Sequence, residues 1–228
     1  IIALQHPQAL QIPSPSGLSL LYGPVEHGLC KERPLTLVVS GVELGIHRDH
    51  DHRLGRPSVS QRPRNRVIRR VRGVALDAAE AKHMMTNLNF GDAATQDGRG
   101  AAQYLKQSSA KVGVVGFCMG GALTVLAALY VKEVNACSSW YGFPPEQAGD
   151  VKTITVPLQL HLAEKDGSFS PDGARALEAK LKEGNVPFES YWYDAGHAFG
   201  NETGPNYNAP CAKLAWDRTT EFFAKHLK

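Results

Sequence analysis

The sequence has no apolar run of about 18 residues, the length that a helix needs to cross a bilayer. Its first seven residues lack a basic leader followed by a long apolar core, so we expect neither secretion nor a membrane span. Cysteine is scarce, with four in 228 residues and no Cys-x-x-Cys pair. This usage predicts reduced thiols and a cytoplasmic protein. No internal repeat is visible.

Apolar runs typical of strands alternate with segments of helical periodicity. A length of 228 residues suffices for one α/β domain over residues 1–228. After a hairpin at 12–22, we expect strands at 35–39, 112–117, 134–140, 154–162 and 188–193, and helices at 77–88, 93–105, 119–131, 171–182 and 212–227. Such alternation predicts a mostly parallel sheet with helices on both faces.

The segment Gly116-Phe117-Cys118-Met119-Gly120-Gly121 joins an expected strand to an expected helix. A nucleophile between a strand and a helix, with glycines on both sides, is typical of a nucleophile elbow. Glycine is needed there because side chains flanking the strained apex would collide. The N-terminus of the helix would favour a thiolate at Cys118. The alternative is a small buried hydrophobic residue, as most free cysteines are.

Two further polar residues follow expected strands. Asp166 comes after the strand at 154–162, and His197 comes after the strand at 188–193. The carboxyl ends of parallel strands meet at one edge, so these side chains should converge on Cys118. The chain order of nucleophile, acid and histidine is the order that α/β hydrolases use. Asp172 is a rival acid, although its position suits a carboxylate in the first turn of a helix.

Taken together, these motifs resemble the dienelactone hydrolase family, the cysteine-nucleophile branch of the α/β hydrolases. Further similar features are Trp140-Tyr141-Gly142, Ala195-Gly196-His197-Ala198-Phe199, Tyr207 and the amphipathic end of the chain. The resemblance covers roughly residues 73–228 well and the first forty residues loosely. It implies an α/β-hydrolase fold in which Cys118 is the nucleophile, His197 the general base and acid, and Asp166 the residue that orients the imidazole.

The resemblance also implies residues around the substrate. The N–H of Met119 would be one oxyanion donor. Glu43 stands near a family glutamate that contacts the resting thiol, although an ordinary exposed glutamate is the alternative. Tyr141, Phe199 and Asn201 are candidate pocket residues. Asn201 stands where dienelactone-specific members carry an arginine for a substrate carboxylate, which argues against a carboxylate-bearing lactone.

Other polar residues have structural interpretations. Cys137 is most simply a packed thiol on a strand. His161 and Asp194 lie on or near strands and are interpreted as structural, with support of the catalytic residues as the alternative for either one.

The segment 41–72 does not fit the alternation. Nine arginines against two aspartates in 47–72 give that stretch a net charge of +7, whereas the whole chain carries +3. No apolar stripe at helical spacing runs through residues 48–66. The open alternatives are a polyanion-binding arm, a metal site from His47, His50 and His52 with neighbouring aspartates, and a disordered insertion.

A fourth alternative explains more of this segment. Members of the family that the chain resembles carry here a helix similar to Ala-Asp-Arg-Leu-x-x-x-Gly. Codon degeneracy lets residues 55–63 be written so that a one-nucleotide slip encodes Ala-Asp-Arg-Leu-Ser-Ala-Asn-Gly. We therefore hypothesise that this region is read in a shifted frame, either in the gene or in its reported sequence. Peptide mass mapping of residues 41–72 decides whether the protein contains the given sequence or the frame-shifted one.

The sequence thus predicts a hydrolase of a small ester, lactone or thioester that works through a cysteinyl acyl-enzyme and requires no metal or organic cofactor. We expect a small-molecule substrate, no nucleic-acid partner, no membrane partner, and a monomer or small homo-oligomer. The alternative from another class is a non-catalytic binding protein in which Cys118 contacts a ligand or serves as a redox thiol. Turnover of an activated ester separates the two.

Overall fold

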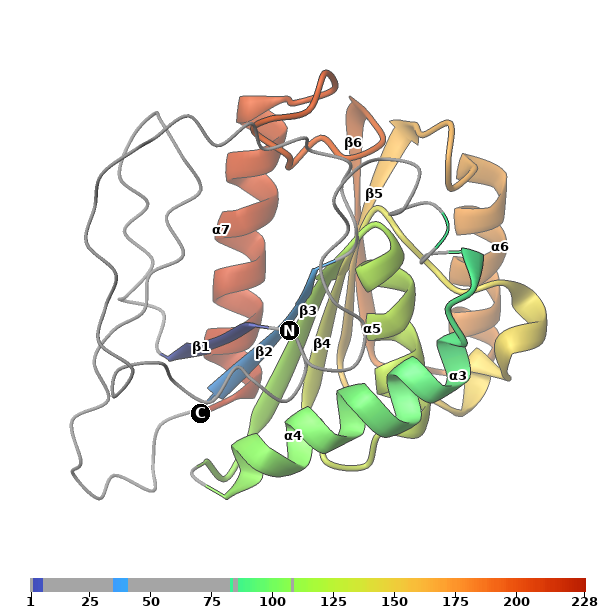
Figure 1. The fold of residues 1–228 in the computed structure, drawn as a ribbon. Coiled ribbons are helices and arrows are strands. Elements are labelled where there is room, and N and C mark those ends of the chain that lie inside the picture. The colour runs from blue at the N-terminus through green and yellow to red at the C-terminus, as the bar shows by residue number, and fades with distance from the viewer. Residues whose placement is uncertain (1, 6–34, 41–82, 84–85, 108) are drawn as a thin grey trace.

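One sheet runs through the molecule in the order β1-β2-β3-β4-β5-β6. Figure 1 shows the computed structural model, in which residues 2–5, 35–40, 83, 86–107 and 109–228 are described. Among the described strands, only β1 is antiparallel to its neighbour, and all later pairs are parallel. The strands are β1 (Ile2–Gln5), β2 (Leu35–Ser40), β3 (Val112–Phe117), β4 (Ala136–Trp140), β5 (Leu158–Lys165) and β6 (Phe188–Gly196). The predicted α/β class is confirmed.

Helices cover both faces of this sheet (Figure 1). On one face lie α5 (Met119–Tyr130) and α6 (Pro171–Glu183). The same face carries a continuous helical stretch made of α3 (Phe90–Asp92), the π-helical η3 (Ala93–Gly98) and α4 (Arg99–Lys106). On the other face lies α7 (Ala209–His226). Successive residues of a strand point to opposite faces. Accordingly Val114 of β3 belongs to the core under α4, α5 and α6, and Val115 to the core under α7.

Several boundaries differ from the sequence expectation. The strand predicted at 154–162 begins at Leu158, because residues 151–153 form a 3-10 turn and Pro157 has no N–H to donate. It continues to Lys165, and β6 continues to Gly196, so both strands end directly before a candidate site residue. The last helix begins earlier than predicted, because Asn208 caps it through the N–H of Cys211 at 3.2 Å.

The pairing of β5 with β6 contains a register shift near the carboxyl end of both strands. Ala163 pairs with Tyr193 and Lys165 pairs with Gly196, so β6 holds one residue more than β5 between these two pairs. Such irregularities turn later side chains and are common beside functional sites. Because Lys165 pairs with Gly196, the residues that follow them, Asp166 and His197, lie side by side at the end of the two strands.

Three sequence predictions lie outside the described residues: the hairpin at 12–22, most of the helix at 77–88, and the arginine-rich segment 41–72 with its histidines. Among the residues that the structure describes, no helix has both the length and the apolar character needed to cross a membrane.

Candidate active site

Cys118 occupies a sharp turn between β3 and α5, with φ 55° and ψ −121°. A positive φ in a residue with a side chain is strained, and such strain persists only where surrounding contacts hold it. The N–H of Cys118 donates to the carbonyl of Trp140 at 3.0 Å, and its own carbonyl accepts from Gly121 at 2.8 Å. At Gly116 a Cβ would lie 2.0 Å from the carbonyl oxygen of Gly120. The sequence prediction that glycine is required beside the turn is therefore confirmed for Gly116.

His197 lies between Cys118 and Asp166. Its Nε2 is 3.1 Å from the sulfur of Cys118, and its Nδ1 is 3.0 Å from Oδ2 of Asp166. The other carboxylate oxygen of Asp166 accepts the N–H groups of Ser168 at 2.7 Å and Phe169 at 2.8 Å. An ionised carboxylate only accepts, so Nδ1 carries a proton and Nε2 faces the sulfur. The three residues expected at separate strand ends do meet.

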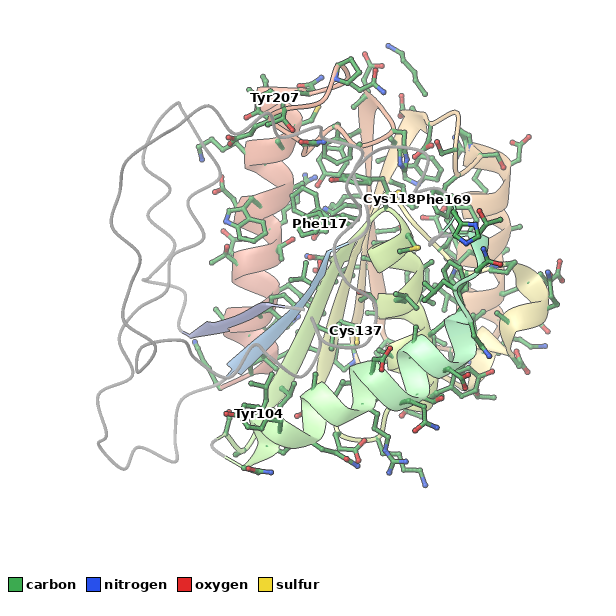
Figure 2. All side chains as sticks on the ribbon, viewed as in Figure 1. Tyr104, Phe117, Cys118, Cys137, Phe169 and Tyr207 are labelled. Atoms are coloured by element: carbon green, nitrogen blue, oxygen red, sulfur yellow. The ribbon has the colours of Figure 1, made fainter. Side chains whose placement is uncertain are left out.

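Two aromatic rings hold the imidazole of His197. The ring of Phe169 stacks on it with a centroid distance of 5.6 Å and an interplanar angle of 27°. Tyr141 meets it edge-on at 5.5 Å. Figure 2 shows Cys118 and Phe169 at the carboxyl end of the strands, whereas Cys137 lies at the other end. The sequence reasoning gave Phe169 no role, although its position three residues after Asp166 was the available signal.

The protonation of His197 is set by opposing effects. Burial lowers the pKa of His197, but its hydrogen bonds with Asp166 and Cys118 and their negative charges outweigh that effect and raise it to about 9. The surroundings thus favour the protonated imidazole. When the imidazole is protonated, its Nε2–H donates to the sulfur of Cys118.

The oxyanion donors are described in part. Met119 is the first residue of α5, so its N–H is one of the groups with no acceptor inside the helix. It directly follows Cys118, where a tetrahedral oxyanion would form. Glu43 and the loop expected to supply a second donor lie outside the described residues.

The candidate pocket residues differ in their surroundings. Tyr141 is 1% exposed and Phe199 is 0% exposed, and their rings pack together at 5.1 Å. Phe199 is thus packed inside the core rather than on an accessible wall. Oδ1 of Asn201 accepts the N–H of Thr203 at 3.0 Å and its hydroxyl at 2.9 Å, so it stabilises its own loop. A contact between any of these residues and substrate stays a prediction.

The rival groups lie elsewhere. Asp172 is exposed in the first turn of α6, as its sequence position suggested, and Asp166 is the carboxylate beside His197. Cys137 is fully buried, and burial raises the pKa of its thiol. Asp194 forms an exposed ion pair with Lys165.

Known proteins resemble this chain in sequence and in fold. It is 34% identical over 125 residues to carboxymethylenebutenolidase of Pseudomonas putida, covering 54% of this chain and 52% of that protein. It is 32% identical over 125 residues to carboxymethylenebutenolidase 1 of Cupriavidus pinatubonensis, with the same coverage. The chain thus spans about half the length of these curated relatives.

The fold has solved counterparts. A dienelactone hydrolase-like promiscuous phosphotriesterase from metagenomic libraries superposes with a TM-score of 0.60 at 21% identity, covering 68% of this chain and 70% of that one. The sequence matches the dienelactone hydrolase family over residues 68–227, which is more than half of the chain and includes every residue of the Cys118, His197 and Asp166 group. The chain belongs to the dienelactone hydrolase family.

Proposed function

We propose that this chain hydrolyses a small ester, lactone or thioester through a cysteinyl acyl-enzyme. The proposal depends on two hydrogen-bond contacts of His197. Its Nε2 lies 3.1 Å from the sulfur of Cys118, and its Nδ1 lies 3.0 Å from Oδ2 of Asp166. A nucleophile, a base within hydrogen-bond reach and a third group that orients the base are the parts that acyl transfer requires. Relatives named carboxymethylenebutenolidase support the same class of reaction.

In the first half of the proposed cycle, the thiolate of Cys118 attacks the carbonyl carbon. A carbon–sulfur bond forms as the carbonyl electron pair moves to oxygen, where the N–H of Met119 would donate to it. When the intermediate collapses, the carbonyl re-forms and the bond to the leaving group breaks. The leaving group takes the proton from Nε2 of His197.

In the second half, His197 is neutral and acts as a base. A water molecule gives one proton to Nε2 while its oxygen bonds to the acyl carbon. Collapse of this second intermediate breaks the carbon–sulfur bond and returns the electron pair to Cys118 as a thiolate. The acid leaves, and the imidazolium is restored. Asp166 would hold Nδ1–H throughout and stabilise each charged form of the imidazole.

The surroundings of His197 favour a neutral, apolar substrate. Phe117, Met119, Phe143 and Phe169 are all partly exposed beside the cysteine turn or the imidazole. The amide of Asn201 stands four residues after His197, where a cation would suit a carboxylate. We therefore propose that neutral esters react faster than lactones that carry a carboxylate.

Turnover of a small panel tests the proposal: p-nitrophenyl acetate, a neutral lactone, a carboxylate-bearing lactone and an acyl thioester. We expect hydrolysis by the wild-type chain and none by Cys118→Ala. If Cys118→Ala were as active as the wild type, the acyl-enzyme would be excluded. If no member of the panel reacted while a thiol-directed ligand bound, the non-catalytic alternative would replace the proposal.

A further inference from the structure

A fully buried polar network lies beneath the candidate site, on the face of the sheet that α7 covers. Its centre is His161 of β5, which is 0% exposed. Nδ1 of His161 is 2.8 Å from the hydroxyl of Tyr193, and Nε2 is 2.8 Å from Oε1 of Gln159 and 2.9 Å from Oγ1 of Thr219. Burying so many polar groups is costly unless every one is hydrogen-bonded. The proposed hydrolysis uses none of these groups directly.

The donor and acceptor in each hydrogen bond of this network can be assigned from the amide of Gln159. The amide nitrogen of Gln159 donates to Glu189 at 2.8 Å and to the carbonyl of Arg218 at 3.1 Å, so its oxygen faces His161 as an acceptor. His161 therefore carries its proton on Nε2, and its Nδ1 accepts the hydroxyl proton of Tyr193. Arg218 in turn donates to the Tyr193 oxygen at 3.1 Å. Burial, together with the charge of Arg218, lowers the pKa of His161 to about 3, which keeps the ring neutral.

Thr219 connects this network to Trp140. The hydroxyl of Thr219 donates to the carbonyl of Ala215 at 2.9 Å, which leaves its oxygen lone pairs free to accept. The indole N–H of Trp140 donates to that oxygen at 3.1 Å. The rings of Trp140 and His161 also lie 4.8 Å apart. The position of the indole is thus fixed from two sides.

Trp140 contacts both halves of the candidate site. Its carbonyl accepts the N–H of Cys118 at 3.0 Å, the bond that holds the strained turn. Its ring stacks on Phe199 at 5.8 Å, two residues beyond His197. The next residue, Tyr141, donates its N–H to the carbonyl of His161 at 2.7 Å and meets the imidazole of His197 edge-on.

We propose that His161 and Thr219 are positioning residues, which hold Trp140 and thereby fix the separation of the Cys118 sulfur and Nε2 of His197. The inference rests on the proposed cysteine chemistry of the site. A misplacement of reacting groups by about 1 Å can lower a rate by about a hundredfold, so the separation of sulfur and imidazole matters for reactivity. The network acts through the main chain of Trp140, so its effect reaches the site without touching substrate.

The test compares Thr219→Val, which keeps the shape but removes the hydroxyl, with Thr219→Ser, which keeps the hydroxyl. The measurement is the rate of Cys118 alkylation by iodoacetamide from about pH 5 to about pH 9, with peptide mass mapping and with urea unfolding in parallel. Leu181→Ala is the control, because Leu181 is fully buried in the core on the opposite face and its truncation destabilises the fold without touching the network.

We expect Thr219→Val to slow alkylation of Cys118 about tenfold at neutral pH and to move the rise of the rate to higher pH. Thr219→Ser should remain within about threefold of the wild type, and Leu181→Ala should lose stability but keep the alkylation rate. Trp140→Phe removes the indole N–H together with one of the two rings, so it should slow alkylation at least as much as Thr219→Val. It provides a second variant if the valine substitution does not fold.

Two results would overturn the inference: alkylation of Thr219→Val and Trp140→Phe at the wild-type rate, or a loss in Leu181→Ala as large as theirs. Ester turnover is measured separately, so a failure of this inference can be told apart from a failure of the proposed function. If wild-type Cys118 is activated through Thr219 but no ester is hydrolysed, the positioning role stands and the proposed function is wrong. If wild-type Cys118 reacts no faster than Cys211, both are wrong.

Discussion

A Cβ on Gly142 would lie 1.9 Å from the carbonyl oxygen of Cys118, closer than a non-bonded carbon and oxygen can approach. Gly142 follows the Trp140 carbonyl that holds the cysteine turn, and it is buried. Gly142→Ala must therefore displace main-chain atoms of either segment. We expect ester turnover to fall by at least about a hundredfold, with a destabilisation on the order of 3 kcal/mol in urea unfolding.

A matched control for that substitution exists in α4. Gly100 is exposed, and a Cβ there would meet no atom within 4 Å. Gly100→Ala should stabilise the fold by about 0.5–1 kcal/mol and leave turnover unchanged, because alanine loses less backbone entropy in a helix. Equal effects of the two substitutions would show that the approach of Gly142 to Cys118 is not what constrains this position.

Selective alkylation tests the thiolate at Cys118. One equivalent of iodoacetamide should label Cys118 ahead of Cys30, Cys137 and Cys211 and abolish turnover. Burial raises the pKa of Cys137, and burial with the charge of Asp194 raises that of Cys211, so both react slowly. His197→Gln should abolish the preference. Uniform labelling of all four native thiols would mean that Cys118 is not activated.

The identity of the acid is tested with a pair of aspartates. Asp166→Asn replaces the acceptor of the Nδ1 proton with an amide and should lower turnover by about 10³–10⁴-fold while the fold persists. Asp172→Asn alters only an exposed carboxylate in the first turn of α6 and should change turnover little. The reverse result in steady-state kinetics would transfer the acid role to Asp172.

The charge on His197 predicts how stability depends on pH. Its folded-state pKa of about 9 exceeds the ordinary value of 6.5, so the folded chain binds this proton more tightly. The resulting stabilisation is complete below about pH 6.5 and is lost as the pH rises through about 9. In the Cys118→Ala background, where no thiol exchanges a proton with the imidazole, the free energy of unfolding of the His197 protein minus that of His197→Gln should fall as the pH rises above about 6.5. An increase of this difference with pH would contradict the assignment.

The sequence predicted the meeting of Cys118, Asp166 and His197 because each follows a strand, and parallel strands end at one edge. It could not predict the network around His161. Ser138, Gln159, Tyr193 and Thr219 come from three strands and a helix, and none has a local pattern that distinguishes it from an ordinary core polar residue. Such convergence depends on strand register and helix rotation, which a single sequence does not specify.

Element boundaries were predicted less accurately where local chemistry competed with hydrophobic periodicity. The helix expected at 93–105 begins at Phe90 and contains π-helical turns over Ala93–Gly98. The apolar run from 154 suggested a strand, but β5 begins only at Leu158 and the residues 151–153 form a 3-10 turn. Asn201 was proposed from its distance to His197 along the chain, whereas its amide bonds within a turn of its own loop.

The extra residue in β6 makes chain length, rather than residue identity, the critical property near Asp194. Asp194 is 72% exposed and pairs only with Lys165 among the described residues, so its side chain contributes little to stability. Deleting it would instead invert the faces of all later residues of the strand and turn His197 away from Cys118. Asp194→Ala should be nearly neutral, while a single-residue deletion at the same place should be inactive. We therefore expect this position to tolerate substitutions of the side chain but not the deletion of a residue.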